Sequence, residues 1–410
     1  MPPPSSGSRP SLAAIAITAA LALAGHGCAS PGSGIQSGEH VTVYVSMPLS
    51  GAEAANGRDV TDGARLALAE ARRRVGDLAV HAVYLDDTGA GGGRPRWSPA
   101  AAAANARRAT EDSTAIAYLG DFDSGATRFS LPVTNEARML QVSPASSAVD
   151  LVQPFLGAGD QVPDVQHTGE RTFGRVIPSD EVQAQAGAVW AKRLHAKDVI
   201  AVGDGSSFAH TVGAAFRAEA RALGLMTGRS RLPGPEAKCG VTASLGDALK
   251  TTYYAGERSP TLGQVSCALA PGANSHVFST DAVLRSRALR SISARARAAY
   301  VTSAAQDPRQ LPARGQDLMR RFAARYGRRP GRYAAYGYEA MAVILDSIRR
   351  AGDSGDDRDA VVRSFFDTTD RHSVLGRYSI DEVGNTTLNR LTGYRVRDGR
   401  PVFDTPITVP

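Results

Sequence analysis

Two serine-containing segments have the residue types and spacing of an anion-binding site. Gly120 to Ser124 (GDFDS) joins an apolar run to the start of an amphipathic stretch, and Pro144 to Ser147 (PASS) follows the next apolar run. Each segment is expected to lead from a strand into a helix, where backbone N–H groups lack intrahelical partners and the dipole favours negative charge. With the hydroxyl groups of Ser124 and Ser147, this pattern predicts a carboxylate site without a basic side chain. The plainer interpretation is that both serines only cap helices.

Motifs of common catalytic sites are missing from the sequence. It has no GxSxG elbow, no HExxH helix, no GxGxxG after the first apolar run and no GxxxxGK[ST] phosphate loop. The acidic pairs Asp86-Asp87 and Asp356-Asp357 fall in expected loops, where we interpret them as solvated. Histidines stand singly at positions 81, 167, 195, 210, 276 and 372. The sequence therefore predicts no catalytic residue, no cofactor and no metal site, and an exported enzyme is the less favoured alternative.

The first 27 residues have the pattern of an export signal. Leu12 to Ala24 is an apolar run, preceded by Arg9, that is too short to span a bilayer permanently. The run is followed by Gly27-Cys28 and by a polar tether, residues 28–39. The segment that ends at Cys28 resembles a bacterial lipobox, with atypical residues before Gly27. This arrangement predicts that Cys28 is lipidated and anchors the protein to the outer face of the cell membrane. The alternative is ordinary cleavage nearby and secretion.

The two other cysteines, Cys239 and Cys267, form an even pair. Outside the cytoplasm such a pair is expected to form a disulfide. Neither cysteine has a CxxC partner or a nearby set of histidine and carboxylate residues, so a thiol nucleophile or a metal site is less favoured.

Composition favours a globular chain with more than one core. The chain has 410 residues, of which 42% are hydrophobic and 21% charged, and this length suits two lobes. The net charge of +7 would permit an anionic partner. However, the arginine clusters at 72–74, 320–321 and 328–329 lie on expected helix faces and are not interleaved with aromatic residues. We therefore predict that the protein does not bind nucleic acid.

Short β-branched or aromatic runs alternate with longer amphipathic stretches, which predicts an α/β fold with mostly parallel sheets. The chain should end differently, in an antiparallel meander over 374–403 with turns at 382–385 and 398–399. The expected strands are 41–47, 79–85, 115–119, 140–142, 199–202, 251–254, 276–278 and 300–302. A first helix is entered at Gly57, with apolar residues continuing to Val75, and further helices are expected at 99–111, 124–137, 180–195, 208–223, 313–326, 334–350 and 358–367.

An ordered set of segments resembles the leucine/isoleucine/valine-binding proteins, the type I periplasmic solute-binding proteins of branched-chain amino acid ABC transporters. The resemblance implies a two-lobed α/β fold, each lobe a mostly parallel sheet with helices on both faces, joined by three hinge crossings. It also implies closure of the hinge around a ligand that touches both lobes. The segments are VSMPLSG (45–51), DGA (62–64), YLGDFDSGAT (118–127), LPVTNEARMLQVSPASS (131–147), RTFGRVIPSDEVQAQA (171–186), YYAGERSPTLGQ (253–264) and YAAYGYEAM (333–341).

The same resemblance places the lobe limits. Residues 40–171 and 304–373 would form the N-terminal lobe, and residues 172–303 and 374–410 the C-terminal lobe. The loaded protein would be a monomer that docks on the permease subunits of an ABC importer.

The resemblance also assigns ligand-binding roles to individual residues. Ser124 and Ser147 would bond the ligand carboxylate, and the backbone carbonyl group of Ala145 would accept from its ammonium group. Asp281 falls where the family has an acidic residue that pairs with the ammonium group, although aspartate is shorter than the usual glutamate.

Four further positions would line the ligand site. Phe208 matches an aromatic residue of the family, and Tyr333 is a candidate for the apolar side. Glu257 and Asn56 stand where the family has aromatic residues, and a carboxylate at 257 favours a more polar or more cationic ligand than leucine. Each of these residues could equally be a core or rim residue.

Together these observations predict a substrate-binding lipoprotein that captures an amino acid or an amino-acid-like small molecule. One alternative is a ligand-sensing module of the same fold that acts on a signalling partner. Another is a binding protein with degenerate specificity, because positions 56, 257 and 281 depart from the family pattern.

Overall fold

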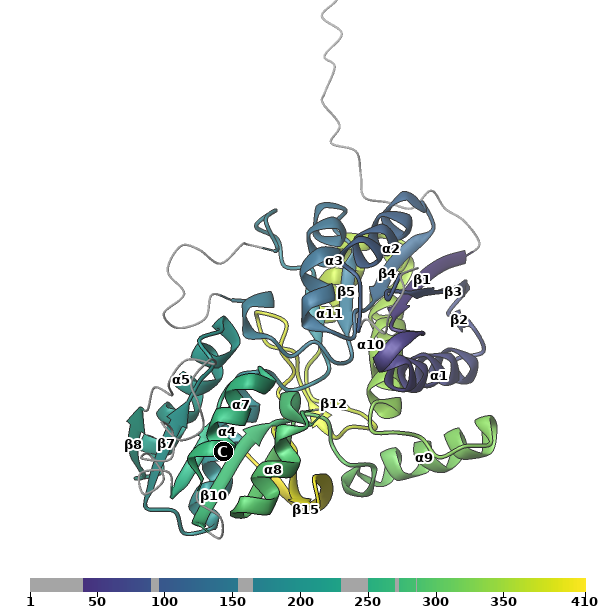
Figure 1. The fold of residues 1–410 in the computed structure, drawn as a ribbon. Coiled ribbons are helices and arrows are strands. Elements are labelled where there is room, and N and C mark those ends of the chain that lie inside the picture. The colour runs from purple at the N-terminus through teal and green to yellow at the C-terminus, as the bar shows by residue number, and fades with distance from the viewer. Residues whose placement is uncertain (1–39, 90–95, 154–164, 230–249, 270–272, 285) are drawn as a thin grey trace, which may run out of the picture. The chain divides into compact units, whose positions relative to one another are not determined.

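The described chain is built on two β-sheets. The computed structural model describes residues 40–89, 96–153, 165–229, 250–269, 273–284 and 286–410. Within these ranges one sheet has six strands, a second has seven, and a two-stranded ribbon accompanies them (Figure 1). The predicted alternation of strands and helices is therefore present and is divided between two sheets.

The first sheet is parallel except at one edge. Its strands run in the order β2-β3-β1-β4-β5-β6, and β2 pairs antiparallel with β3. Side chains of β1 alternate between the two faces, so Val41, Val43 and Val45 enter one hydrophobic cluster and Tyr44 enters another. The strands are β1 (His40–Met47), β2 (Arg74–Val75), β3 (Leu78–Asp86), β4 (Ala115–Leu119), β5 (Leu140–Ser143) and β6 (Phe173–Arg175).

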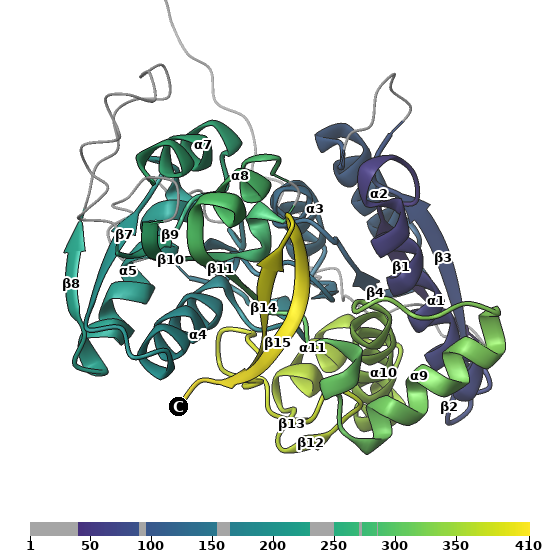
Figure 2. The same ribbon diagram turned by 60° about the horizontal axis from the view of Figure 1, so that its bottom comes forward.

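Helices cover both faces of the first sheet, as its apolar strands require. α2 and α3 pack on the face that carries Tyr44, whereas α1, α10 and α11 pack on the opposite face (Figure 2). None of the helices in the described ranges is both long and apolar enough to cross a bilayer. Their bounds are α1 (Ala54–Glu70), α2 (Pro99–Glu111), α3 (Ser124–Glu136), α10 (Ala334–Arg350) and α11 (Arg358–Phe366).

The second sheet is parallel with an antiparallel hairpin at one edge. Its strands run in the order β15-β14-β11-β10-β9-β7-β8, and both β11–β14 and β14–β15 are antiparallel pairs. The strands are β7 (Asp198–Val202), β8 (Met226–Arg229), β9 (Thr251–Tyr254), β10 (Ala273–Thr280), β11 (Ala296–Ser303), β14 (Arg390–Arg397) and β15 (Arg400–Thr408). The separate ribbon consists of β12 (Arg371–His372) and β13 (Arg377–Tyr378).

Helices also cover both faces of the second sheet. α4 (Asp180–Arg193) and α5 (Ser207–Ala222) pack on one face, where Trp190 contacts Phe278 and Tyr300 edge to face. α7 (Ser259–Ala268) and α8 (Ala288–Arg295) pack on the other face in a second hydrophobic cluster. The remaining long helix, α9 (Ala313–Tyr326), ends at Gly327, which adopts a left-handed conformation with φ of 65°.

The chain passes between the two sheets three times within the described residues: after β6, after β11 and before β14. The predicted fold class, two mostly parallel sheets with helices on both faces, is confirmed. The predicted lobe limits at residues 171, 303 and 373 lie near these passages and stay a prediction, and β6 still pairs with β5 of the first sheet.

Three predicted elements differ from the structure. α1 ends at Glu70, and Val75 belongs to β2, because Arg72 and Arg73 take positive φ angles of 55° and 54° and turn the chain. Pro144 to Ser147 is followed by a three-residue 3₁₀ turn, η2 (Val149–Leu151), and not by an α-helix. The expected C-terminal meander is divided, since β13 pairs with β12 while β14 and β15 join the second sheet around the predicted turn at 398–399.

Candidate functional site

Two loops at the carboxyl ends of β4 and β5 lie against each other. Because β4 and β5 are parallel neighbours, both loops leave the same edge of the first sheet, where ligands of α/β proteins commonly bind. The Ser146 hydroxyl donates to the carbonyl oxygen of Asp121 (2.9 Å), and the backbone N–H of Ala148 donates to the Ser124 hydroxyl oxygen (3.1 Å). The structure therefore brings the two serine-containing segments together.

Ser124 is the first residue of α3 and is half-buried. The N-cap is Asp123, whose carboxylate accepts from the backbone N–H of Gly125 (2.9 Å). Arg96 forms an ion pair with this carboxylate (2.7 Å) and so balances its charge beside the helix N-terminus. No acceptor among the described residues takes the Ser124 hydroxyl hydrogen, which leaves a donor for a ligand.

Ser147 is engaged with the start of α4. Its carbonyl oxygen accepts from the backbone N–H of Asp180 (2.9 Å), and its hydroxyl hydrogen-bonds the Asp180 carboxylate. Burial raises the pKa of Asp180 to about 6, against the opposing effect of this hydrogen bond. Ala145 is half-buried beside it, with its N–H directed to the Ser143 hydroxyl oxygen (3.2 Å). The ligand roles expected for Ser147 and Ala145 stay predictions.

Arg175 on β6 positions the second loop. Its side chain is fully buried, and Nη1 donates to the carbonyl oxygens of Ser146 (3.2 Å) and Ala148 (2.8 Å). Its Nε and Nη2 have no hydrogen-bond partner among the described residues. Burial lowers the pKa of Arg175 to about 10, so the guanidinium remains cationic at neutral pH.

Asp281 lies at the carboxyl edge of the second sheet, in the short turn η5 (Asp281–Val283) that follows β10. Gln183 of α4 donates to its Oδ1 (2.9 Å), and Ser303 at the end of β11 donates to its Oδ2 (2.7 Å). β10 and β11 are parallel neighbours, which is why Asp281 and Ser303 leave the sheet side by side. Both carboxylate oxygens of Asp281 therefore already accept one hydrogen bond.

Arg332 and Tyr333, which precede α10, connect the Asp281 region with the α3 region. Nη1 of Arg332 donates to the Ser303 hydroxyl oxygen (3.2 Å). The rings of Tyr333 and Phe122 make an edge contact, with their centroids 4.7 Å apart, and Phe122 belongs to the loop that leads into α3. Burial raises the pKa of Tyr333 against the opposing charge of Arg332, and the Asp281 and Glu53 carboxylates add to the increase.

Glu257 is exposed and faces charged residues. Its backbone N–H donates to the Asp204 carboxylate (2.9 Å), and its own carboxylate interacts electrostatically with Asp204, Arg96 and Asp123. Glu257 is therefore within electrostatic reach of Arg96 and Asp123 at the start of α3. Its role with a ligand stays a prediction.

Asn56 and Phe208 have structural partners of their own. The Asn56 amide donates to Glu53 (2.7 Å), a buried acid of the turn η1 (Gly51–Glu53). Phe208 near the start of α5 is half-buried and packs against the main hydrophobic cluster. The ligand contacts expected for both residues stay predictions.

Buried acids lie beneath the first loop. Asp87 is fully buried, and neither of its carboxylate oxygens has a hydrogen-bond partner among the described residues. Burial, followed by the neighbouring Asp121 and Asp86, raises the pKa of Asp87 to about 9. Asp121 is also fully buried, accepts hydrogen bonds from Tyr118 (3.2 Å) and Ser130, and has a pKa raised by burial to about 6. The interpretation of Asp86-Asp87 as a solvated pair is therefore wrong for Asp87.

Three arginines near the site were missed by reasoning from sequence: Arg96, Arg175 and Arg332. Arg332 stands next to Tyr333 in the sequence, but nothing distinguished it from the neighbouring surface arginines at 328 and 329. No group of three or more His, Cys, Asp or Glu residues in the described ranges is placed to hold a metal ion. The chemistry of the site therefore rests on hydroxyl, amide, carboxylate and guanidinium groups.

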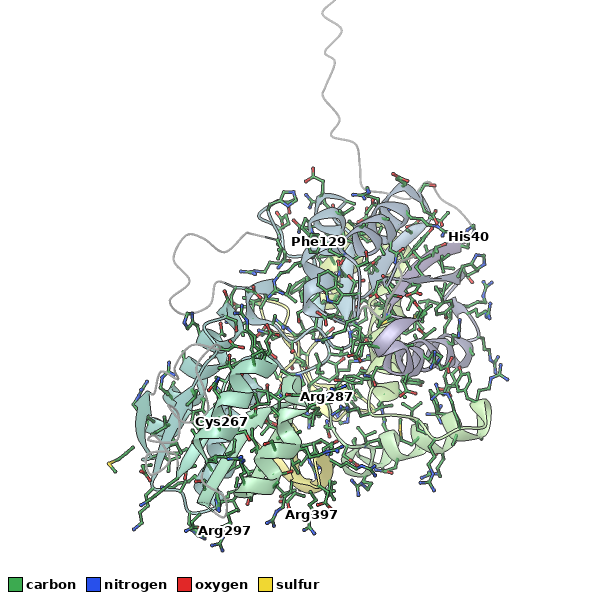
Figure 3. All side chains as sticks on the ribbon, viewed as in Figure 1. His40, Phe129, Cys267, Arg287, Arg297 and Arg397 are labelled. Atoms are coloured by element: carbon green, nitrogen blue, oxygen red, sulfur yellow. The ribbon has the colours of Figure 1, made fainter. Side chains whose placement is uncertain are left out.

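The cysteine predictions involve parts of the chain that the structure does not describe. Cys267 lies in α7 (Figure 3), whereas Cys28 and Cys239 lie outside the described residues. The disulfide and the lipid anchor both stay predictions.

Comparison with solved structures supports the fold along nearly the whole chain. A leucine-binding protein from Thermotoga maritima is 22% identical with a TM-score of 0.66, covering 90% of this chain and 99% of that one. A substrate-binding protein of an ABC transporter from Desulfitobacterium hafniense, solved with leucine, is 18% identical with a TM-score of 0.68, covering 89% and 100%. A solute-binding protein from R. palustris, solved with benzoate, is 13% identical with a TM-score of 0.63, covering 90% and 97%.

Sequence comparison gives a match to one protein family over part of the chain. Residues 40–237 match the periplasmic binding protein family. No curated protein sequence matches the chain. The matched segment contains the first sheet and the loops of Ser124 and Ser147, and the shared fold extends through the second sheet. Residues 40–237 are therefore similar to the periplasmic binding proteins, and the chain has the two-lobed type I fold.

Proposed function

We propose that the chain is an extracytoplasmic solute-binding lipoprotein of an ABC importer. It captures an amino acid or an amino-acid-like small molecule between its lobes, closes about a hinge, and delivers the ligand to permease subunits. The proposed anchor is a lipid on Cys28. Structural neighbours from the same type of transporter were solved with leucine, isoleucine and benzoate, which are all small molecules with a carboxylate.

The contact between the start of α3 and the loop after β5 is the observation that carries this proposal. Ser124 offers an unused hydroxyl hydrogen at a helix N-terminus, and the Ala148 N–H fixes the orientation of that hydroxyl (3.1 Å). Arg96 balances Asp123, so the helix N-terminus is not blocked by an uncompensated negative charge (2.7 Å). A carboxylate bound here would accept charge-assisted hydrogen bonds worth about 1.5 to 3 kcal/mol each, enough for micromolar capture if several form.

A thermal-shift screen of amino acids, amides and small carboxylates tests the proposal. The protein from residue 40 onward should be stabilised by about 2.7 kcal/mol when a ligand is present at one hundred times its dissociation constant. Turnover of any hit into a product, or the absence of any hit, would count against the proposal.

Replacing Ser124 by alanine should weaken binding of a hit about tenfold or more, because one charge-assisted hydrogen bond is lost. Isothermal titration calorimetry measures the change in Kd. Ser354→Ala is the matched control, since Ser354 is an exposed serine of the turn η7 (Gly352–Ser354). Equal affinities of wild type and Ser124→Ala would show that the ligand binds elsewhere.

A further inference from the structure

The carboxylate of Asp281 is held by hydrogen bonds within the protein. Its Oδ2 accepts from the Ser303 hydroxyl (2.7 Å), and that hydroxyl oxygen accepts from Nη1 of Arg332 (3.2 Å). Ser303 thus links a carboxylate and a guanidinium in a short chain of hydrogen bonds. The Gln183 amide occupies the other carboxylate oxygen of Asp281 (2.9 Å).

Arg332 remains a cation in these surroundings. Its burial alone would lower the pKa of the guanidinium, but the nearby Tyr333 and Asp281 outweigh this effect and raise the pKa. The guanidinium also lies near the rings of Tyr333 (5.4 Å from the centroid) and Tyr394 (6.0 Å).

Arg332 also keeps hydrogen-bonding capacity. A guanidinium has five N–H donors. Within the described part of the chain Arg332 makes no direct ion pair with a carboxylate, and its Nη1 donates to the Ser303 hydroxyl oxygen. A half-buried cation with unused donors attracts an anion and repels a second cation.

The cation is connected to the proposed carboxylate site. Arg332 is followed by Tyr333, whose ring contacts Phe122 (centroids 4.7 Å apart), and Phe122 lies two residues before Ser124. A small ligand that bonds Ser124 and packs on Tyr333 would therefore lie close to Arg332. Its ammonium group, if it had one, would lie near this cation and near an acid whose two carboxylate oxygens already accept hydrogen bonds.

We propose that Arg332 determines ligand specificity and that the site prefers a small monocarboxylate with an aliphatic or aromatic body and no free α-ammonium group. Arg332 favours the carboxylate and disfavours the ammonium group, and Tyr333 and Phe122 provide an aromatic surface for the body. Discrimination arises from repulsion of the wrong charge as well as from attraction of the right one. This inference rests on the proposed function, of which it specifies the ligand class.

Two pairs of ligands that differ only in the α-ammonium group test the inference. They are 4-methylpentanoate with leucine, and 3-phenylpropanoate with phenylalanine. Calorimetry on the purified protein should show that each ligand without the ammonium group binds at least tenfold more tightly than its amino acid partner. Tighter binding of the amino acid in both pairs would overturn the inference.

Variants of Arg332 separate its charge from its shape. Arg332→Gln should reduce the preference for the ligand without the ammonium group about tenfold, whereas Arg332→Lys keeps the charge and should retain most of it. Arg329→Gln is the matched control, because Arg329 is exposed and close in sequence. An unchanged preference in Arg332→Gln would overturn the proposed role of Arg332.

A second variant covers the case in which Arg332→Gln does not fold. Asp281→Asn removes the nearby negative charge, leaves Arg332 in place, and should increase the preference for the ligand without the ammonium group. A decrease would contradict the inference.

If neither class of ligand binds, both the proposed function and this inference fail. If amino acids bind in a Ser124-dependent way and are preferred, only this inference fails.

Discussion

Replacing Asp87 by asparagine is expected to raise the Tm by about 3 °C or more at pH 8, and by much less at pH 4.5. Asp87 is fully buried, and in the part of the chain that the structure describes neither carboxylate oxygen has a hydrogen-bond partner. Its charge would also be repelled by Asp121, Asp86 and Asp123. Asparagine is similar in shape and carries no charge, so it avoids both the cost of burying a charge and the repulsion by the neighbouring acids.

The pH dependence follows from the raised pKa. The pKa of Asp87 is about 9 in the folded chain, against an ordinary value of 3.8. Between these values the unfolded carboxyl group loses its proton while the folded one keeps it, so the folded state becomes less stable as pH rises. Each unit of pKa difference corresponds to about 1.4 kcal/mol in the free energy of unfolding. Asp87 and Asp121 interact, so this free energy belongs to the pair. The free-energy cost to the folded state is therefore absent below about pH 4 and reaches its full size by about pH 9.

Thermal unfolding of wild type and Asp87→Asn between pH 4.5 and pH 9 measures this difference. Asp353→Asn is the control, because Asp353 is exposed in η7 and undergoes the same replacement of a carboxyl group by an amide. A Tm difference between Asp87→Asn and wild type that stays constant with pH would contradict the assignment of a protonated carboxyl group at Asp87.

Replacing Gly337 by alanine is expected to lower the Tm by about 5 °C or more. α1 and α10 pack so closely that a Cβ atom at Gly337 would overlap the carbonyl oxygen of Val60. Gly63 makes the reciprocal approach, since a Cβ atom there would overlap the carbonyl oxygen of Ala334. Overpacking of a core costs about 1 to 3 kcal/mol, and backbone atoms cannot move aside as a flexible side chain can. The two helices would have to separate along their contact.

Gly263→Ala is the matched control for Gly337→Ala. Gly263 lies within α7, and nothing is within 4 Å of the position that its Cβ atom would occupy. Alanine there should leave the Tm unchanged or raise it, because glycine is a poorer helix former by about 1 kcal/mol. Equal Tm values for Gly337→Ala and wild type would mean that α1 and α10 pack less closely than described. Differential scanning calorimetry measures both variants.

Elements with strong hydrophobic periodicity were predicted well. The strands at Ala115–Leu119 and Thr251–Tyr254 and the helices at Pro99–Glu111, Ala313–Tyr326 and Ala334–Arg350 have the predicted bounds. In each, the spacing of apolar residues matches the face that is buried.

Elements without such a pattern were missed. α7 contains glycine and several small polar residues, and β8 lies at the edge of its sheet, where Met226 is 70% exposed. Their structure depends on packing against the sheet and on pairing with a neighbouring strand, neither of which local sequence encodes.

The sequence by itself determined that the chain alternates strands and helices and that Ser124 stands where a strand leads into α3. Local propensity and periodicity act over a few residues, and parallel strands necessarily place their following loops at one edge. Only the tertiary structure decided that Arg332 and Asp281 share the Ser303 hydroxyl and that the Asp87 carboxyl group is buried without a hydrogen-bond partner among the described residues. These features depend on the burial of individual charges and on pairings between residues distant in the sequence, because a charge out of water is stabilised or destabilised by whatever the fold brings beside it.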